Sequence, residues 1–429
     1  MKFKLNINLK WQKATEMASA SLARTARRFA SATTPPGAFS RERLAAWRHA
    51  LHRQPELGFD LFKTSQFVAD TLASFGGDMA IARGLGGTGV VASLRGGGGA
   101  SGRGIALRAD MDALPIFEEA DVPYRSEVDG VAHLCGHDGH TAMLLGAAEH
   151  LVSVADTIDG TVHFVFQPAE EAGGGGEVMV QDGLFRDVAA DATAVYGLHN
   201  WPRAISKTLR PGGFAATAGP VMAGADEFEM TITGRGGHAA MPHVCVDPVL
   251  AGAQVVVALQ ALVSRSTSPL DSVVVSVTCF GAGEAVNAIP ETATLKGTVR
   301  TFDEAVRKRV KARLLDTAAA VAGAFGATVD CDYVDGYPPT VNGADETAFA
   351  AACAARVVGA DNVVFDEPPS MGAEDFSYLL RERPGAYLWL GGDSDYALHH
   401  PKYVFDHATL TTGAAWFATL ASSALRADS

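Results

Sequence analysis

The chain has 429 residues, enough for two or three domains, and 48% of them are hydrophobic while 19% are charged. This composition is typical of a compact globular protein, and we see no apolar run that indicates a membrane span. A formal net charge of −13 argues against a nucleic-acid partner and favours a small-molecule substrate. The five cysteines are scattered and odd in number, so they indicate free thiols in a reducing, cytoplasmic compartment.

Residues 1–39 differ in composition from the rest of the chain. They are rich in Lys, Arg, Ala, Ser and Thr, and Glu16 is their sole acid. Such a segment is expected to be a disordered extension. Its composition also resembles a transit peptide, and a start codon assigned too far upstream would explain it equally well. Folded structure is expected from residue 40, where Leu44 and Leu51 lie at helical spacing.

Between residues 88 and 200, short apolar runs alternate with helical patterns, which predicts an open α/β sheet with helices on both faces. Three of the runs end in polar motifs: 104–107 before Asp110 and Asp112, 161–166 before Glu170 and Glu171, and 194–197 before His199 and Asn200. Ligands bind at the carboxyl ends of strands in open α/β sheets, so we expect these groups to converge.

The stretch 135–140 sets a thiol, two imidazoles and a carboxylate directly before a helical pattern that begins at Thr141. A thiolate and a neutral imidazole are good ligands for zinc and its first-row neighbours, so Cys135 and His137 are candidate metal ligands. Taken alone, the stretch is equally compatible with a small core cysteine and a polar loop. The strand-end motifs favour the metal site.

Glu170 and Glu171 follow an apolar strand and precede a glycine run at 173–176. One carboxylate of such a pair can bind a metal while its neighbour takes a proton from water, whose pKa a metal ion lowers from about 15.7 to about 7. A charged strand terminus is the simpler alternative. His199 and His399 are weak signals individually and gain weight beside these groups.

A second unit is predicted to interrupt the first. Its elements are a strand at 226–234, a helix at 247–265, strands at 272–280 and 293–301, a helix at 303–325 and a strand at 327–334. This βαββαβ order is ferredoxin-like. The predicted domains are therefore a larger one, built from residues 40–215 and 335–429, and an insertion at 216–334.

In combination, seven motifs resemble the metal-dependent amidohydrolases of the aminoacylase and carboxypeptidase family, in the branch of hippurate hydrolase and the indole-acetyl-amino-acid hydrolases. The motifs are 51–57, 108–115, 135–140, 168–171, 197–200, 234–238 and 371–376. The resemblance covers residues 44 to about 420. It implies a zinc-peptidase-like catalytic domain with an inserted dimerisation, or lid, domain.

The resemblance also implies a centre of two divalent transition-metal ions (Mn, Zn, Co or Ni), held by Cys135, His137, Glu171, His199 and His399. Glu170 would be the general base, and Asp112 would orient a ligand. The family has a histidine, then Ser or Asn, then Pro near the carboxyl end. This chain has His399-His400-Pro401, so His400 remains an alternative ligand.

In the inserted domain, the resemblance assigns His238 to the substrate carbonyl, and Asn287 and Arg300 to the substrate carboxylate. A surface charge remains the alternative for Arg300, and an ordinary glycine-rich turn for His238. The glycines at 234–237 are too flexible for a strand interior, and a free sheet edge can pair across a two-fold axis. We therefore expect a homodimer in which His238 completes the site of the other subunit.

The predicted reaction is hydrolysis of an N-acyl amino acid to a carboxylic acid and a free amino acid, with Glu170 moving the proton and His238 stabilising the oxyanion. A carboxypeptidase or dipeptidase with the same centre is the alternative, because nothing in the sequence shows what fills the acyl pocket. A catalytically silent binding protein would be expected to have lost ligands or the base, and every one is present.

Overall fold

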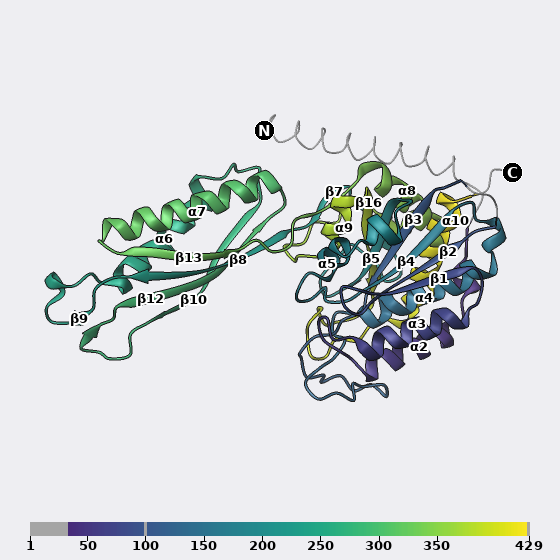
Figure 1. The fold of residues 1–429 in the computed structure, drawn as a ribbon, viewed down its shortest axis with the longest axis horizontal. Helices are drawn as coiled ribbons and strands as arrows, with labels where there is room; N and C mark the ends of the chain where they lie inside the picture. The colour runs from purple at the N-terminus through teal and green to yellow at the C-terminus, as the bar shows by residue number, and fades with distance from the viewer. Residues whose placement is uncertain (1–32, 98–100, 427–429) are drawn as a thin grey trace. The chain divides into compact units, whose positions relative to one another are not determined.

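The computed structural model describes residues 33–97 and 101–426, which form two compact units (Figure 1). The first unit contains the described residues up to Gly219, together with Val341–Pro368 and those from Tyr378 onward. The second contains Pro220–Thr340 and Pro369–Ser377. The second unit interrupts the first in sequence, and the predicted α/β class with an inserted ferredoxin-like unit is confirmed.

Most of the predicted N-terminal extension, up to residue 32, lies outside the described residues. Its last part is folded: Pro36–Ala38 form the short helix η1, and the Thr34 N–H donates a hydrogen bond to Thr419 Oγ1 at 3.1 Å. Folded structure therefore begins before residue 40, because this segment packs on the last helix of the chain. The helix expected next is α2 (Arg41–Arg53), capped by the Ser40 hydroxyl, which accepts from the Arg43 N–H.

Eight strands form the sheet of the first unit, in the order β1-β2-β4-β3-β5-β16-β6-β15. Their bounds are β1 (Met79–Leu85), β2 (Gly89–Arg95), β3 (Gly104–Asp110), β4 (Thr161–Gln167), β5 (Ala192–Pro202), β6 (Phe214–Ala215), β15 (Val363–Val364) and β16 (Gly385–Gly392). The four central strands, β4, β3, β5 and β16, are mutually parallel, whereas β1, β2 and β6 add antiparallel pairs. The carboxyl ends of the central strands consequently share one edge.

Helices α4 (His137–Ser153), α8 (Ala344–Val358) and α10 (Leu410–Ala424) pack on this sheet, and α2 and α3 (Phe62–Ser74) contact α4 (Figure 1). Every residue of β3 and β16 is buried, as expected for parallel strands covered on both faces. Shorter elements are η2 (Ala155–Thr157), α5 (Gly175–Gln181), η3 (Leu184–Val188), β7 (Gly219–Met222), β14 (Thr340–Asn342), η5 (Ala360–Asn362), α9 (Phe376–Glu382) and η6 (His407–Thr409).

The second unit has an antiparallel sheet in the order β10-β12-β8-β13, with two helices packed on it (Figure 1). Its elements are β8 (Gly224–Thr233), β9 (Gly237–His238), η4 (Pro242–Val244), α6 (Pro248–Arg265), β10 (Val273–Ala282), β11 (Ala288–Ile289), β12 (Thr292–Thr301), α7 (Glu304–Ala324) and β13 (Thr328–Val334). This is the predicted βαββαβ order. Asp247 and Asp303 cap the amino ends of α6 and α7.

One described helix, α6, is long and apolar enough to cross a membrane, which the sequence analysis did not anticipate. The helix meets this criterion by length and composition only. Ala251, Val255 and Leu259 are fully buried in the core of the second unit. A single helix of this kind is weak support for a membrane span, because core helices have the same composition.

Candidate metal centre

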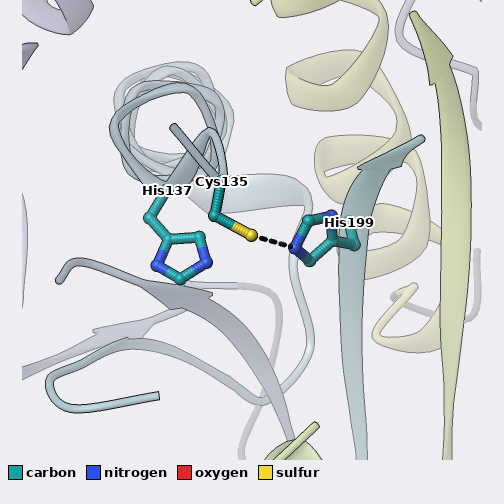
Figure 2. A group of neighbouring side chains, drawn as sticks. All are labelled: Cys135, His137 and His199. Atoms are coloured by element: carbon teal, nitrogen blue, oxygen red, sulfur yellow. Dashed lines mark hydrogen bonds between the residues drawn. The ribbon is translucent and has the colours of Figure 1, made fainter. Parts of the chain in front are cut away.

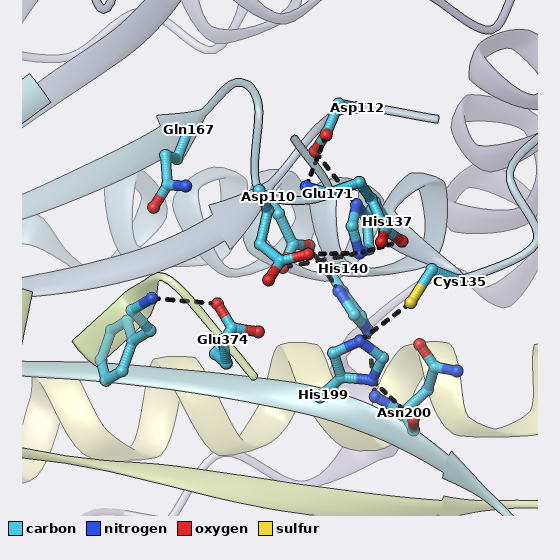
Figure 3. A network of polar contacts seen from close by, with 12 residues as sticks. Asp110, Asp112, Cys135, His137, His140, Gln167, Glu171, His199, Asn200 and Glu374 are labelled. Atoms are coloured by element: carbon cyan, nitrogen blue, oxygen red, sulfur yellow. Dashed lines mark hydrogen bonds and ion pairs between the residues drawn. The ribbon is translucent and has the colours of Figure 1, made fainter. Parts of the chain in front are cut away.

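The polar groups that follow the central strands lie together at the carboxyl edge of the sheet (Figure 3). Asp112 comes after β3, Glu170 and Glu171 after β4, and His399 after β16, while His199 lies near the end of β5. Cys135 and His137 reach the same region from the loop before α4 and from its first turn. The parallel arrangement of the strands produces this convergence.

α4 begins at His137, four residues before the helical pattern that starts at Thr141. Its first turn is polar, so apolar periodicity cannot reveal it. Gly136 precedes the helix with a φ of 95°, and an added Cβ would lie 2.3 Å from Asn200 Oδ1. Only glycine fits this left-handed, crowded position, which separates the two candidate ligands Cys135 and His137.

Three groups formed by predicted site residues alone share members, and within each group the potential ligand atoms lie within 4.8 Å of one another. The first consists of Cys135, His137 and His199, with the Cys135 Sγ 3.3 Å from the His199 Nε2 (Figure 2). The others are His137 with Glu170 and Glu171, and Cys135 with Glu171 and His399. Because the groups share members, six predicted site residues surround one region.

Hydrogen bonds orient the two buried histidines. The His199 Nδ1–H donates to the Asn200 carbonyl at 2.7 Å, which leaves Nε2 facing Cys135. The His137 Nδ1–H donates to Asp112 Oδ1 at 3.2 Å, which leaves Nε2 at 3.8 Å from Glu171 Oε1. Asp112 Oδ2 also accepts the Glu171 N–H at 2.9 Å. Asp112 therefore positions two of the candidate ligands at once.

Burial and charge shift the pKa values at this site. Burial raises the pKa of the Cys135 thiol well above its ordinary value, and the carboxylates of Glu171, Glu170 and Asp110 add to the effect. Burial opposes the charged form of His137, but nearby carboxylates outweigh it and raise the pKa of that imidazole to about 10. Burial lowers the pKa of His199 well below its usual range. The region is buried and rich in negative charge, so it favours a bound cation.

The donor set fits a transition-metal ion. Within residues 33–97 and 101–426, His137 Nε2 is among the buried side-chain atoms that lack a hydrogen-bond partner. Such atoms are costly unless something else binds them. Thiolate, imidazole and carboxylate together suit a divalent transition metal far better than Mg²⁺.

Of the two adjacent histidines, His399 is the one that lies beside the cluster. Its Nε2 is 3.2 Å from Glu171 Oε1, and its backbone N–H donates to the Leu134 carbonyl at 2.9 Å. The His400 ring instead stacks on Tyr396, with centroids 4.5 Å apart. The backbone of His399 is strained, because its φ of 66° lies in the left-handed region.

Ala169 is the other described non-glycine residue with a positive φ, at 55°, and it directly precedes Glu170. Glu170 is buried, with Oε2 at 3.9 Å from His137 Nε2. Left-handed backbone at non-glycine residues costs on the order of 1–3 kcal/mol and is found mainly where surrounding structure enforces it. Both instances flank the candidate metal centre.

A second polar network beside the centre, around Asp110, was not predicted. Its carboxylate accepts from Arg108 Nη1 and from the His140 Nδ1–H, both at 2.6 Å. Burial opposes the charged form, but His137 and Arg108 outweigh it and hold the pKa of Asp110 well below its usual range. The His140 Nε2 accepts the Asn200 N–H at 3.0 Å. Asp110 lies in motif 108–115 and His140 in motif 135–140. These two motifs were the sequence signal that could have indicated the network.

The remaining predicted site residues, His238, Asn287 and Arg300, belong to the second unit. β9 pairs with β11, and the Ala239 N–H donates to the Asn287 carbonyl at 3.0 Å, so His238 and Asn287 lie at one exposed pair of short strands, which we call the β9–β11 ribbon. Arg300 lies half-buried at the far end of β12, opposite Ala225.

The length of β12 separates these residues within one copy of the chain. β12 begins at Thr292, directly after β11, which is one strand of the β9–β11 ribbon. The strand rises about 3.4 Å per residue, so the eight steps to Arg300 span about 27 Å. A small substrate cannot contact the ribbon and Arg300 of the same copy.

Residues 106–423 match the model of peptidase family M20/M25/M40. The chain is 38% identical over 379 residues to a hippurate hydrolase from Campylobacter jejuni, covering 88% of this chain and 96% of that one. It is 37% identical to thermostable carboxypeptidase 2 from Saccharolobus solfataricus, covering 87% and 93%. Among solved structures, the YXEP protein of Bacillus subtilis, a dinuclear metal-binding peptidase of family M20, superposes with a TM-score of 0.77 at 33% identity, covering 90% and 98%.

Proposed function

The chain belongs to peptidase family M20/M25/M40, and from this premise we propose that it is a metal-dependent amidohydrolase that cleaves N-acyl amino acids to a carboxylic acid and a free amino acid. The observation that carries the proposal is the buried convergence of a thiol, imidazoles and carboxylates at the carboxyl edge of the sheet. The similarity to a hippurate hydrolase over most of the chain supports the substrate class.

Two divalent ions would be held by Cys135, His137, Glu171, His199 and His399. Mn, Zn, Co and Ni suit this donor set, and the dinuclear centre of the similar YXEP protein supports the number of ions. When bound, such ions polarise the acyl carbonyl and lower the pKa of a coordinated water.

The chain's own residues would supply proton transfer and orientation. Glu170 is buried beside His137 and would accept the proton of the attacking water and pass it to the leaving nitrogen. Asp112 would keep the His137 ring and the Glu171 backbone in place through its two carboxylate oxygens. Glu170 would then transfer protons while its neighbour Glu171 binds a metal ion, so neither side chain would have to serve both purposes.

We further propose that the predicted insertion at 216–334 is a dimerisation domain and that His238 and Asn287 act in the site of a second copy. The separation of the β9–β11 ribbon from Arg300 along β12 supports this, because only residues from two copies could meet on one substrate. Among the described residues β10 pairs on one side only, with β12, and so offers a sheet edge for the second copy. Exposed apolar residues on α6, Val249, Leu250 and Val257, lie on the same unit.

A cytoplasmic location is part of the proposal. All five cysteines are free, which suits a reducing compartment. The proposed partners are the N-acyl amino acid and a second copy of the chain.

The test is a substrate panel with metal-reconstituted protein. Benzoyl, acetyl and indole-acetyl derivatives of one amino acid are compared with dipeptides that share its carboxyl-terminal residue, and kcat/KM is measured for each. We expect the acyl amino acids to be cleaved faster than the dipeptides. The absence of turnover on every acyl derivative, with metal bound, contradicts the proposal.

A carboxypeptidase or dipeptidase activity is the second candidate, favoured by the similarity to thermostable carboxypeptidase 2. The same panel separates the two. A preference for the dipeptides identifies this activity, since the metal centre serves both reactions equally.

A further inference from the structure

Four charged side chains are buried behind the candidate metal centre, and the proposed reaction does not use them. Arg48 and His52 belong to α2, Glu118 to the loop after β3, and Asp138 to the first turn of α4. Their exposed fractions are 1%, 2%, 4% and 1%, respectively. We call these four residues the charge cluster.

The contacts inside the charge cluster define the charge of each member. Asp138 Oδ2 lies 2.7 Å from His52 Nδ1 and forms an ion pair with Arg48 Nε at 3.0 Å. The other ring nitrogen, His52 Nε2, lies 3.1 Å from Glu118 Oε1. His52 Nδ1 also lies 3.2 Å from Arg48 Nη2, but both ring nitrogens face a carboxylate, and these two anions favour the imidazolium form of the ring. Two cations therefore balance two anions.

The balance of charge matters here because the four side chains are buried. A buried ion is stable only while its partners remain, and loss of one partner leaves an uncompensated charge. Asp138 is the critical member, since its side chain is fully buried and its second oxygen accepts the Gly139 N–H at 2.9 Å. Its charge thus ties the backbone of the first turn of α4 to α2.

That turn carries the candidate ligands. His137 directly precedes Asp138, and Cys135 is three positions earlier. No side chain caps the helix, whose N-cap is Gly136. On the opposite side, Asp112 holds the His137 ring. Two carboxylates therefore hold the turn: Asp112 holds the His137 ring, and Asp138 holds the backbone at Gly139.

Holding α2 and α4 together does not by itself require the charge cluster. Arg43 and Glu149 already join the same two helices through an exposed ion pair at 2.7 Å. Well-packed apolar residues hold helices together at least as well as buried ions do. Buried ions add a fixed geometry where α2 meets the first turn of α4, which carries His137.

We propose that the charge cluster positions the first turn of α4 so that Cys135 and His137 together bind a metal ion. Arg48, His52, Glu118 and Asp138 are accordingly positioning residues. The inference rests on the proposed metal centre, which the experiment tests separately.

The experiment measures Co²⁺ affinity of the metal-free protein through the thiolate-to-cobalt absorption band. His52→Gln leaves two buried anions against one cation, and the double variant His52→Gln with Glu118→Gln restores neutrality around the Arg48–Asp138 pair. Arg43→Gln, which breaks the exposed ion pair between the same helices, is the matched control. The melting temperature of each metal-free protein is recorded in parallel.

We expect His52→Gln to weaken Co²⁺ binding tenfold or more and to reduce the thiolate band, the double variant to recover to within about threefold of wild type, and Arg43→Gln to change nothing. If His52→Gln lowers the melting temperature while its folded fraction binds Co²⁺ with wild-type affinity, the cluster is structural only and the inference is wrong. If His52→Gln does not fold, the double variant decides, since failure of the neutral pair to bind Co²⁺ near wild-type affinity contradicts the proposal. If the wild type shows no thiolate band, the proposed metal centre itself fails.

Discussion

Cys135, His137 and His199 are buried in the first unit and held by neighbours of their own chain, whereas His238 and Asn287 lie at the exposed β9–β11 ribbon of the second unit. The buried histidines each have one ring nitrogen bonded and the other directed at the cluster. His238 Nδ1 accepts from the nearby Ala240 N–H, two residues away. Under the proposed assignment, one copy of the chain would build the metal-binding part of the site, and a second copy would supply the other part.

The largest expected effect concerns Glu170. In Glu170→Gln the shape is kept and the base is lost, so kcat should fall by about 10²–10⁴-fold while metal content persists. Metal content is measured on the same sample by elemental analysis. Glu171→Gln is the contrasting variant, and retention of full metal content there means that the two glutamates have been assigned the wrong way round.

The second prediction concerns Cys135. Cys135→Ala removes a proposed ligand and should weaken metal affinity by about 100-fold or more. Cys353 is the matched control, because it is buried in α8, away from the ligand groups. Equal metal loss in Cys353→Ala would indicate general unfolding instead of ligand removal.

The third prediction tests whether the exposed β9–β11 ribbon acts in the site of a second copy. His238→Ala and Glu170→Gln proteins are dissociated together and reassembled. Half of the dimers are then mixed, each with one intact site, so about a quarter of wild-type activity should return. A mixture that stays inactive, although mass spectrometry shows mixed dimers, places His238 in its own subunit or outside the site.

The smallest expected effect is the pH dependence of the metal-free protein. Burial opposes the imidazolium of His52, but Asp138 and Glu118 outweigh it and raise its pKa. A raised pKa stabilises the fold fully below about 6.5, the unfolded value, and this stabilisation disappears as pH rises through the folded value. Despite its burial, Asp138 has a pKa lowered by Arg48 and His52, so its contribution is present above about 3.9 and disappears as pH falls.

Thermal melting between pH 3 and 9 follows the alkaline decline and the onset of the acid decline. Each unit of pKa difference corresponds to about 1.4 kcal/mol. His52→Gln should remove the part of the alkaline decline that His52 causes, while the raised pKa of His137 leaves the rest. A variant that keeps the full wild-type decline shows that another group is responsible.

Much of the fold was readable from the sequence because its signals are local. Apolar runs located β3, β4 and β5, and helical patterns located α6 and α7. The convergence at the strand ends followed from a general property of parallel sheets. The family resemblance assigned individual roles at that edge.

The features that were missed depend on partners far apart in sequence. The contact of His52 with Asp138 joins two motifs that the sequence analysis noted separately, and neither motif indicates its partner. The first turn of α4 is polar and so escapes apolar periodicity. Likewise, no local pattern reveals that β12 separates Asn287 from Arg300, because both were read only as residues of one domain.

The left-handed backbone of Ala169 bears on how this position can vary. Replacement by glycine would remove about 1 kcal/mol of steric strain, but the freer unfolded chain would cost roughly 0.5–1 kcal/mol in entropy. The two terms nearly cancel, so thermostability gives no reason to exchange one residue for the other. What differs is the mobility of the peptide unit that carries the neighbouring Glu170. Selection at residue 169 would then act on the precision of a proton transfer and not on the melting temperature.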